Sequence, residues 1–200
     1  MNFQKIKDHA LGYVTYFGIA LLGILLFAGI QNGCSYVQGL WGWQLFHSEE
    51  GRFTVRMPKD PIQKTLQGRM NGPRFKEFKA FMAERAGSSY IVGYGDEFED
   101  ILKQFTSEEI LDAARDGVLV STQSQLLIEL RVLKNGFVGR EIKVTTSGLT
   151  ERFQIYVVGK RKYVAGVLAR SSVRSKNDEQ FFNTFQFFPM PSVVPTAVEK

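Results

Sequence analysis

Hydrophobic residues follow three patterns along this chain. Residues 11–30 form a run of twenty without a single charge. Residues 44–95 and 125–170 hold short stretches in which apolar and polar side chains alternate, a pattern typical of half-buried strands. Residues 106–119, and the segment that begins at Asn177, place apolar side chains on one face of a helix instead. The chain therefore divides into an apolar N-terminal segment and a domain of strands and helices.

Turn residues divide the first block of strands. Glu50-Gly51 separates two short alternating stretches and predicts a hairpin. The second strand of this hairpin places three apolar side chains on one face: Phe53, Val55 and Met57. Asn71-Gly72 is a strong tight-turn signal and predicts a second hairpin. Residues 89–95 then form a compact strand of aromatic and β-branched residues.

The second block contains four β-rich runs, which predict a meander. The turns between these runs are predicted at Asn135-Gly136, Ser147-Gly148 and Gly159 to Arg161. Within the meander, Gly139 is interpreted as a bulge or as a place where two backbones approach closely.

Two helices are predicted beside these strands. Thr106 and Glu109 have the spacing of a capping box, and the helix that they begin runs to about residue 119. Asn177-Asp178 opens a final helix with a wide apolar face, formed by Phe181, Phe182 and Phe185. The sequence thus predicts an α+β fold, in which one antiparallel sheet is flanked by helices.

The uncharged N-terminal run predicts a transmembrane helix. Twenty residues at about 1.5 Å each span the roughly 30 Å of a bilayer's hydrocarbon core. Lys5 and Lys7 precede this run and no Lys or Arg follows until Arg52, so the N-terminus is expected in the cytoplasm. The predicted segments are 1–10 cytoplasmic, 11–31 transmembrane, 32–43 linker, 44–188 domain in the periplasm, cell exterior or a lumen, and 189–200 a disordered Pro-rich tail.

The fate of the anchor has three readings. The apolar run is longer than the core of a signal peptide, which favours retention over cleavage. Gly33-Cys34 resembles a lipoprotein cleavage site, so lipidation at Cys34 is an alternative to a plain interfacial cysteine.

Gly29 and Gly33 form a GxxxG pair that could bring two anchors together. No oligomeric state follows from the rest of the sequence.

Charge is distributed unevenly along the domain. Residues 44–116 carry 11 Lys or Arg against 13 Asp or Glu, whereas residues 117–200 carry 12 against 6. The basic side chains of the second part alternate with apolar ones, as expected for the solvated faces of strands. Because no recognition helix or base-stacking motif accompanies them, nucleic-acid binding is not expected.

Residues for catalysis are sparse. The chain has two histidines, and the predicted orientation puts His9 and His47 on opposite sides of the membrane. No nucleophile-elbow motif and no glycine-rich phosphate loop occurs. The chain is therefore not expected to be an enzyme or to carry a cofactor.

Two charged clusters are candidate binding sites. An acidic run could offer oxygen ligands to Ca²⁺ or Mn²⁺, although a solvated turn explains it as well. The candidate metal ligands are Asp96, Glu97, Glu99 and Asp100, with His47 as a further one. Lys160, Arg161 and Lys162 form the densest basic cluster, in a predicted turn that either aids solubility or contacts an acidic partner.

Several motifs resemble a known family. The segments EEGRFTVRMPKDP, NGFVGREIKV, RFQIYVVGKRKYVAGV and FFNTFQFF are similar to bacterial envelope proteins of the PsbP-like fold. That fold is named for an extrinsic photosystem II protein and is shared with a Ran-binding nuclear import factor. The resemblance covers residues 44–188 and implies an α/β/α sandwich with a noncatalytic role.

These observations predict a membrane-anchored binding or assembly module of the cell envelope with a protein partner. Two alternatives remain open. One is a protein that binds a metal or a small ligand through the acidic loop, and the other is an enzyme whose site is assembled from residues distant in sequence.

Overall fold

The computed structural model describes residues 42–66, 77–146, 149–169 and 176–188. The predicted span at 11–31, the tail at 189–200 and the Asn71-Gly72 turn lie outside these ranges. Within the described ranges, no helix is long and apolar enough to cross a bilayer. The anchor therefore stays a prediction from the sequence.

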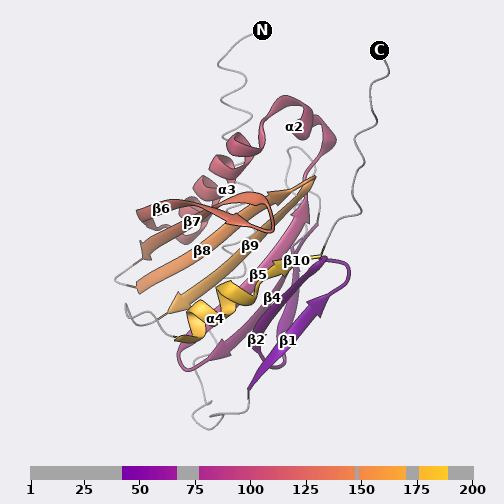
Figure 1. The fold of residues 1–200 in the computed structure, drawn as a ribbon. Coiled ribbons are helices and arrows are strands. Elements are labelled where there is room, and N and C mark those ends of the chain that lie inside the picture. Colours follow the sequence, from indigo (N-terminus) through magenta and orange to yellow (C-terminus); the bar gives the residue numbers. More distant parts are fainter. Residues whose placement is uncertain (1–41, 67–76, 147–148, 170–175, 189–200) are drawn as a thin grey trace.

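The described chain folds into two antiparallel sheets and three helices (Figure 1). The elements in chain order are β1 (Trp43–Ser48), β2 (Phe53–Pro58), β3 (Ile62–Leu66), β4 (Phe78–Arg85), β5 (Ser88–Asp96), α2 (Glu99–Gln104), α3 (Ser107–Thr122), β6 (Gln125–Lys134), β7 (Phe137–Thr146), β8 (Leu149–Val158), β9 (Arg161–Ala169), α4 (Lys176–Thr184) and β10 (Gln186–Phe187). The larger sheet has seven strands in the order β3-β4-β5-β9-β8-β7-β6, and the smaller has three in the order β1-β2-β10. The predicted α+β class, with mostly antiparallel strands and a few helices, is confirmed.

The prediction of a single sheet is wrong. Strands β1 and β2 form a hairpin as expected, but they belong to the smaller sheet, which lies with α4 on one face of the larger sheet (Figure 1). The apolar face of β2 explains this arrangement, because Phe53, Val55 and Met57 are completely buried there. A half-buried strand pair can cover a sheet in the same way as a helix.

Helix α3 covers the opposite face of the larger sheet. Thr106 caps it with the predicted capping box, since its hydroxyl accepts from the Glu109 backbone N–H while the Glu109 carboxylate accepts from the Thr106 backbone N–H. The side chains that α3 buries are the predicted ones: Ile110, Leu111, Ala114 and Val118. They join Ile142, Val144, Phe153 and Ile155 in one core. The helix ends at Thr122, three residues later than predicted. Gln123 has a left-handed backbone conformation, which terminates the helix at this point.

Aromatic rings fill the second core, beneath the smaller sheet. Phe181 and Phe182 are buried on α4, as predicted. Phe185 is buried too, but it lies just beyond the last residue of α4, in the link to β10. Its ring packs edge-on against Phe53 with centroids 5.8 Å apart. Long-range ring contacts of this kind join the end of the domain to its beginning.

Two of the three predicted meander turns lie in the described ranges and are confirmed, at Asn135-Gly136 and between Val158 and Arg161, whereas Ser147-Gly148 lies outside these ranges. Asn135 and Gly136 both have positive φ and close the β6–β7 hairpin. The close-approach interpretation of Gly139 is confirmed, because a Cβ there would lie 2.4 Å from Cδ1 of Tyr156 and 2.5 Å from the carbonyl oxygen of Ile155. Only glycine fits between β7 and β8 at this point.

Candidate functional site

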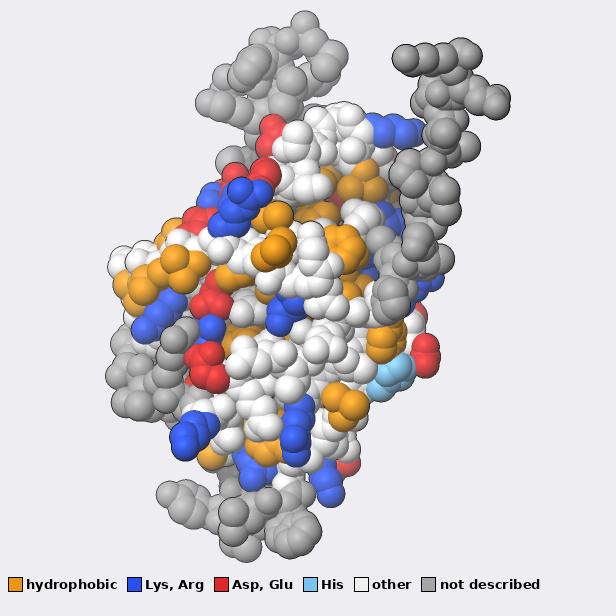
Figure 2. Space-filling view, in the orientation of Figure 1, with side chains coloured by type: hydrophobic (Ala, Val, Ile, Leu, Met, Phe, Trp, Pro, Cys, Tyr) orange, Lys and Arg blue, Asp and Glu red, His pale blue; other side chains and the backbone are white. Residues whose placement is uncertain are grey.

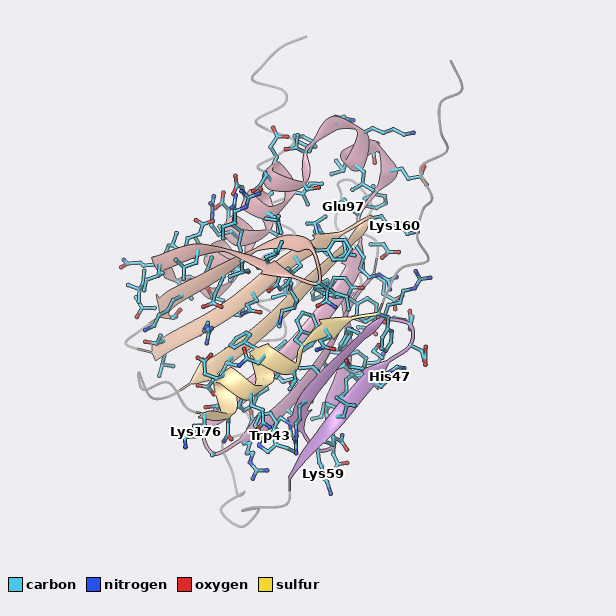
Figure 3. All side chains as sticks on the ribbon, in the orientation of Figure 1. Trp43, His47, Lys59, Glu97, Lys160 and Lys176 are labelled. Carbon is cyan, nitrogen blue, oxygen red and sulfur yellow. The ribbon has the colours of Figure 1, made fainter. Side chains whose placement is uncertain are left out.

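The acidic and basic candidate clusters are neighbours in space. Strand β5 ends at Asp96, which pairs with Arg161 at the start of β9, and Gly95 pairs with Lys162. This antiparallel register brings residues that are far apart in sequence to one end of the larger sheet. Glu97 and Lys160 mark this end of the molecule in Figure 3.

The two clusters neutralise each other. Arg161 donates from Nε to Oδ1 of Asp96 at 2.6 Å, and Lys162 lies 2.5 Å from a carboxylate oxygen of Glu97. Lys160 reaches the second oxygen of Asp96 at 3.6 Å, and its side chain is 60% exposed. Of the three basic residues, Lys160 is therefore the most available to a partner, whereas Arg161 and Lys162 are committed to contacts within the domain.

Arg161 also fastens the first hairpin to the sheet. Its guanidinium donates to the backbone carbonyl of Glu50 and lies over the ring of Tyr94, 5.1 Å from the centroid. Burial tends to raise the pKa of Asp96, but the hydrogen bond and charge of Arg161 outweigh burial and lower this pKa. Asp96 is thus ionised in its pair with Arg161, and the pair stabilises the fold.

The candidate metal ligands do not form one group among the described residues. His47 on β1 lies apart from Glu97 (Figure 3) and pairs with Glu49, with 2.6 Å between Nε2 and Oε1. Glu99 and Asp100 lie in the first turn of α2, where carboxylates favour the positive end of the helix dipole. Within the described ranges, no three His, Cys, Asp or Glu side chains come together as a metal site.

Strand β6 presents a surface that the sequence reading did not identify. It forms one edge of the larger sheet, and no described strand pairs with it on the side away from β7. Five of its ten residues are large, apolar and exposed: Leu126, Leu127, Ile128, Leu130 and Leu133. Figure 2 shows hydrophobic side chains at the surface over this edge. The clue in the sequence is an apolar run on both faces of a strand, which was predicted only as one of the four strands of the meander.

A charged network borders β6 on the face that α3 covers. Glu129 accepts from Arg115 at 3.1 Å and lies 3.2 Å from Nε of Arg140. Arg131 lies 3.2 Å from Glu108 on α3, and its side chain is 66% exposed. On this face of β6, the carboxylate of Glu129 is therefore engaged by arginines of the domain, whereas the guanidinium of Arg131 is largely exposed.

A second network borders β6 on the opposite face. Glu141 on β7 pairs in register with Leu130, and its carboxylate accepts two hydrogen bonds from Arg152, both at 2.8 Å. The side chain of Gln154 donates a further bond to Glu141 at 2.7 Å, and Arg152 also donates to Glu179 on α4. Because the carboxylate of Glu141 is held by these bonds, the apolar side chains of β6 are the accessible feature of this face.

Glu151 on β8 is a buried carboxylate. It is 6% exposed, and within the described part of the chain its Oε2 has no hydrogen-bond partner. Glu151 shares its face of β8 with Phe153 and Ile155 of the core beneath α3. Burial raises the pKa of this carboxyl to about 7.

These elements define an α+β domain of antiparallel sheets, in which most of the exposed large apolar side chains of the described residues lie on the edge strand β6. The chain matches no protein-family model and no curated protein. It is similar to the solution structure of cyanobacterial PsbP from Synechocystis, with a TM-score of 0.49 and 11% identity over 79% of this chain and 99% of that chain. It is also similar to a protein of unknown function from Pseudomonas aeruginosa, with a TM-score of 0.35 and 13% identity over 76% of this chain and 99% of that chain. Similarity of this extent defines neither a family nor a function for the chain.

Proposed function

We propose that this protein is a noncatalytic, membrane-anchored binding or assembly module of the cell envelope. Residues 11–31 anchor it, and residues 44–188 form a PsbP-like domain on the periplasmic, extracellular or lumenal side. The domain binds a protein partner through β6. The observation that supports this function best is the exposed apolar edge of the larger sheet.

Exposed edges are usually protected. Proteins shorten such strands, place charges on them or bend them with bulges, because a free edge offers unpaired backbone groups to other chains. Strand β6 is ten residues long, and its one irregularity in register lies near its start, between Leu126 and Ile128. The length and the apolar side chains of β6 fit a strand that another chain pairs with or covers.

The charged clusters support this choice over a metal or small-ligand site. Asp96 and Glu97 are engaged by the basic residues at the start of β9. Binding a cation at this carboxylate pair would require these ion pairs to break. Contact through β6 leaves the fold of the described residues as it is.

A photocrosslinking amino acid at Leu130 tests the proposed contact in the full-length protein in native membranes. We expect an adduct of defined mass, and we expect it to disappear when Ile128→Lys places a charge on the same face of β6. The matched control is a crosslinker at Leu45 on β1, which is 67% exposed compared with 53% for Leu130. If Leu130 and Leu45 both give no adduct, β6 is not a contact surface.

The predicted orientation has a separate test. Protease added to intact cells or spheroplasts is expected to digest the domain, and untreated samples are expected to show a mass near 22.7 kDa. Protection of the domain until lysis would place it in the cytoplasm and overturn the envelope assignment.

A further inference from the structure

The sequence of β6 is symmetric in chemical type about Leu130. Residues 127–133 read Leu-Ile-Glu-Leu-Arg-Val-Leu. The positions one residue away from Leu130 are Glu129 and Arg131, and the positions two residues away are Ile128 and Val132. The positions three residues away are both leucine. Apolar residues thus mirror apolar residues, and the one acid mirrors the one base.

This symmetry matches the geometry of an antiparallel pair of identical strands. If a two-fold axis passes through Leu130, each residue from Ile128 to Val132, beyond the irregularity between Leu126 and Ile128, faces its mirror position on the other copy. Leu130 then faces itself, Ile128 faces Val132, and Glu129 faces Arg131 in both halves of the pair. Directly opposed apolar pairs and opposed charges each stabilise adjacent strands.

The same charges exclude the neighbouring registers. An axis through Glu129 places two carboxylates directly opposite each other, and an axis through Arg131 does the same with two guanidinium groups. Like charges in directly opposed positions are destabilising. The sequence therefore specifies one register out of these three.

The structure leaves these side chains accessible for such a pairing. Ile128 is 49% exposed, Leu130 is 53% exposed and Leu133 is 71% exposed. The β6–β7 register places Ile128, Leu130 and Val132 on one face, opposite Lys143, Glu141 and Gly139. Glu129 and Arg131 lie on the other face, beside α3. One face of the pair would be apolar and the other charged.

We propose that β6 pairs with β6 of a second copy of this chain, antiparallel and centred on Leu130, so that the two larger sheets become one continuous sheet. This inference rests on the proposed function, in which β6 is the contact surface, and names its occupant. The self-complementary charge pattern favours a second copy over an unrelated strand. A short strand pair buries little surface on its own, and anchoring both copies in one membrane raises their effective concentration.

Cysteine crosslinking tests the register. In the full-length protein with Cys34→Ser, we expect Leu130→Cys to give a covalent dimer when membranes are treated with a mild oxidant, since directly opposed residues lie about 4.5 to 5.5 Å apart between Cα atoms. The matched control is Leu126→Cys, which is exposed on the same strand. Leu126 lies four residues from the axis at Leu130, so two copies of position 126 lie about 27 Å apart in the proposed register and are expected not to crosslink.

Charge variants sharpen this test. In the Leu130→Cys background, Arg131→Glu places a carboxylate opposite Glu129 and is expected to reduce the yield of covalent dimer at least fivefold. Arg131→Lys keeps the charge and is expected to retain most of the dimer. Melting temperatures of the variants show whether the monomer fold is intact.

The outcomes separate this inference from the proposed function. Equal dimer yields at positions 130 and 126 indicate random collision and overturn the second-copy inference. A photocrosslink from Leu130 to a different protein, without the disulfide at position 130, overturns the inference and leaves the proposed function standing. Absence of both products overturns both.

Discussion

The two edges of the larger sheet differ in length and in surface chemistry. Strand β3 has five residues, and among its described side chains one is large, apolar and exposed, Ile62, beside Gln63 and Lys64. Strand β6 has ten residues and five such side chains. Short length and polar residues are the usual protection of an edge, and β3 has both. Strand β6 also carries charges, at Glu129, Arg131 and Lys134, so the contrast lies in its greater length and its five exposed apolar side chains.

The two sides of the sheet are also supported differently. Strands β7 and β8, next to the β6 edge, pack against α3, whereas β4 packs against β2 of the smaller sheet. Comparing the stability of a variant near β6 with that of a similar variant near β3 therefore tests whether the two kinds of support differ in strength.

We expect the largest effect from Gly139→Ala, beside β6. The new Cβ would meet the carbonyl oxygen of Ile155 at 2.5 Å, and a paired backbone cannot move aside. The free energy of unfolding is expected to fall by about 3 kcal/mol, as in overpacked sites. Gly93→Ala is the matched variant on the β3 side, where the closest atom is Cζ at the end of the Phe78 ring. Urea unfolding that shows the larger loss for Gly93→Ala would contradict this reading.

Glu151→Gln tests the buried carboxylate on β8. Its pKa is raised from 4.5 to about 7, so between these values the folded protein holds a proton that the unfolded chain has lost. Stability therefore falls as pH rises from about 4.5 to about 7, and the loss is complete above pH 7. At pH 8 the variant is expected to be more stable than the parent by about 3 kcal/mol.

The same variant carries its own control. At low pH, where the carboxyl is protonated in both states, Glu151→Gln and the parent are expected to unfold at similar denaturant concentrations. Two parallel curves of stability against pH would show that Glu151 is not responsible for the pH dependence.

Thr106→Ala removes the cap of α3 and tests the support of the β6 side. The free energy of unfolding is expected to fall by about 1 kcal/mol, because the backbone N–H of Glu109 loses its partner. Thr106→Ser keeps the hydroxyl and is the matched control. An equal loss in both variants, measured by thermal unfolding, would point away from capping.

The smallest change in monomer stability is expected from the edges themselves. Leu130→Lys and Ile62→Lys are both surface substitutions, and each is expected to shift the free energy of unfolding by less than about 0.5 kcal/mol. Chemical crosslinking of the full-length protein in native membranes is expected to show loss of dimer for Leu130→Lys alone. Loss of dimer with Ile62→Lys as well would remove the distinction between the edges.

Local signals in the sequence predicted much of the fold. The capping box at Thr106, the turn at Asn135-Gly136 and the close approach at Gly139 each depend on a few neighbouring residues, and the structure confirms all three. The apolar faces of α3 and β2 were equally readable, because a fixed period determines which side chains share a face.

Long-range pairing was not predictable in this way. The separate sheet depends on Thr54 pairing with Gln186, and the neutral end of the larger sheet depends on Asp96 pairing with Arg161. The edge position of β6 is also a property of strand order, so its apolar run was indistinguishable from a core strand along the sequence. The acidic segment was read as a loop, although Glu99 and Asp100 begin α2.

The smaller sheet has a consequence for the order of synthesis. Strand β2 lies between β1, which comes first in the domain, and β10, which comes last. A ribosome makes the chain from the N-terminus, so β2 is present long before Gln186 and Phe187 exist to pair with it. One edge of β2 therefore remains without its β10 partner until nearly the whole domain has been made. In a chain that stops before residue 186, this edge of β2 never gains that partner.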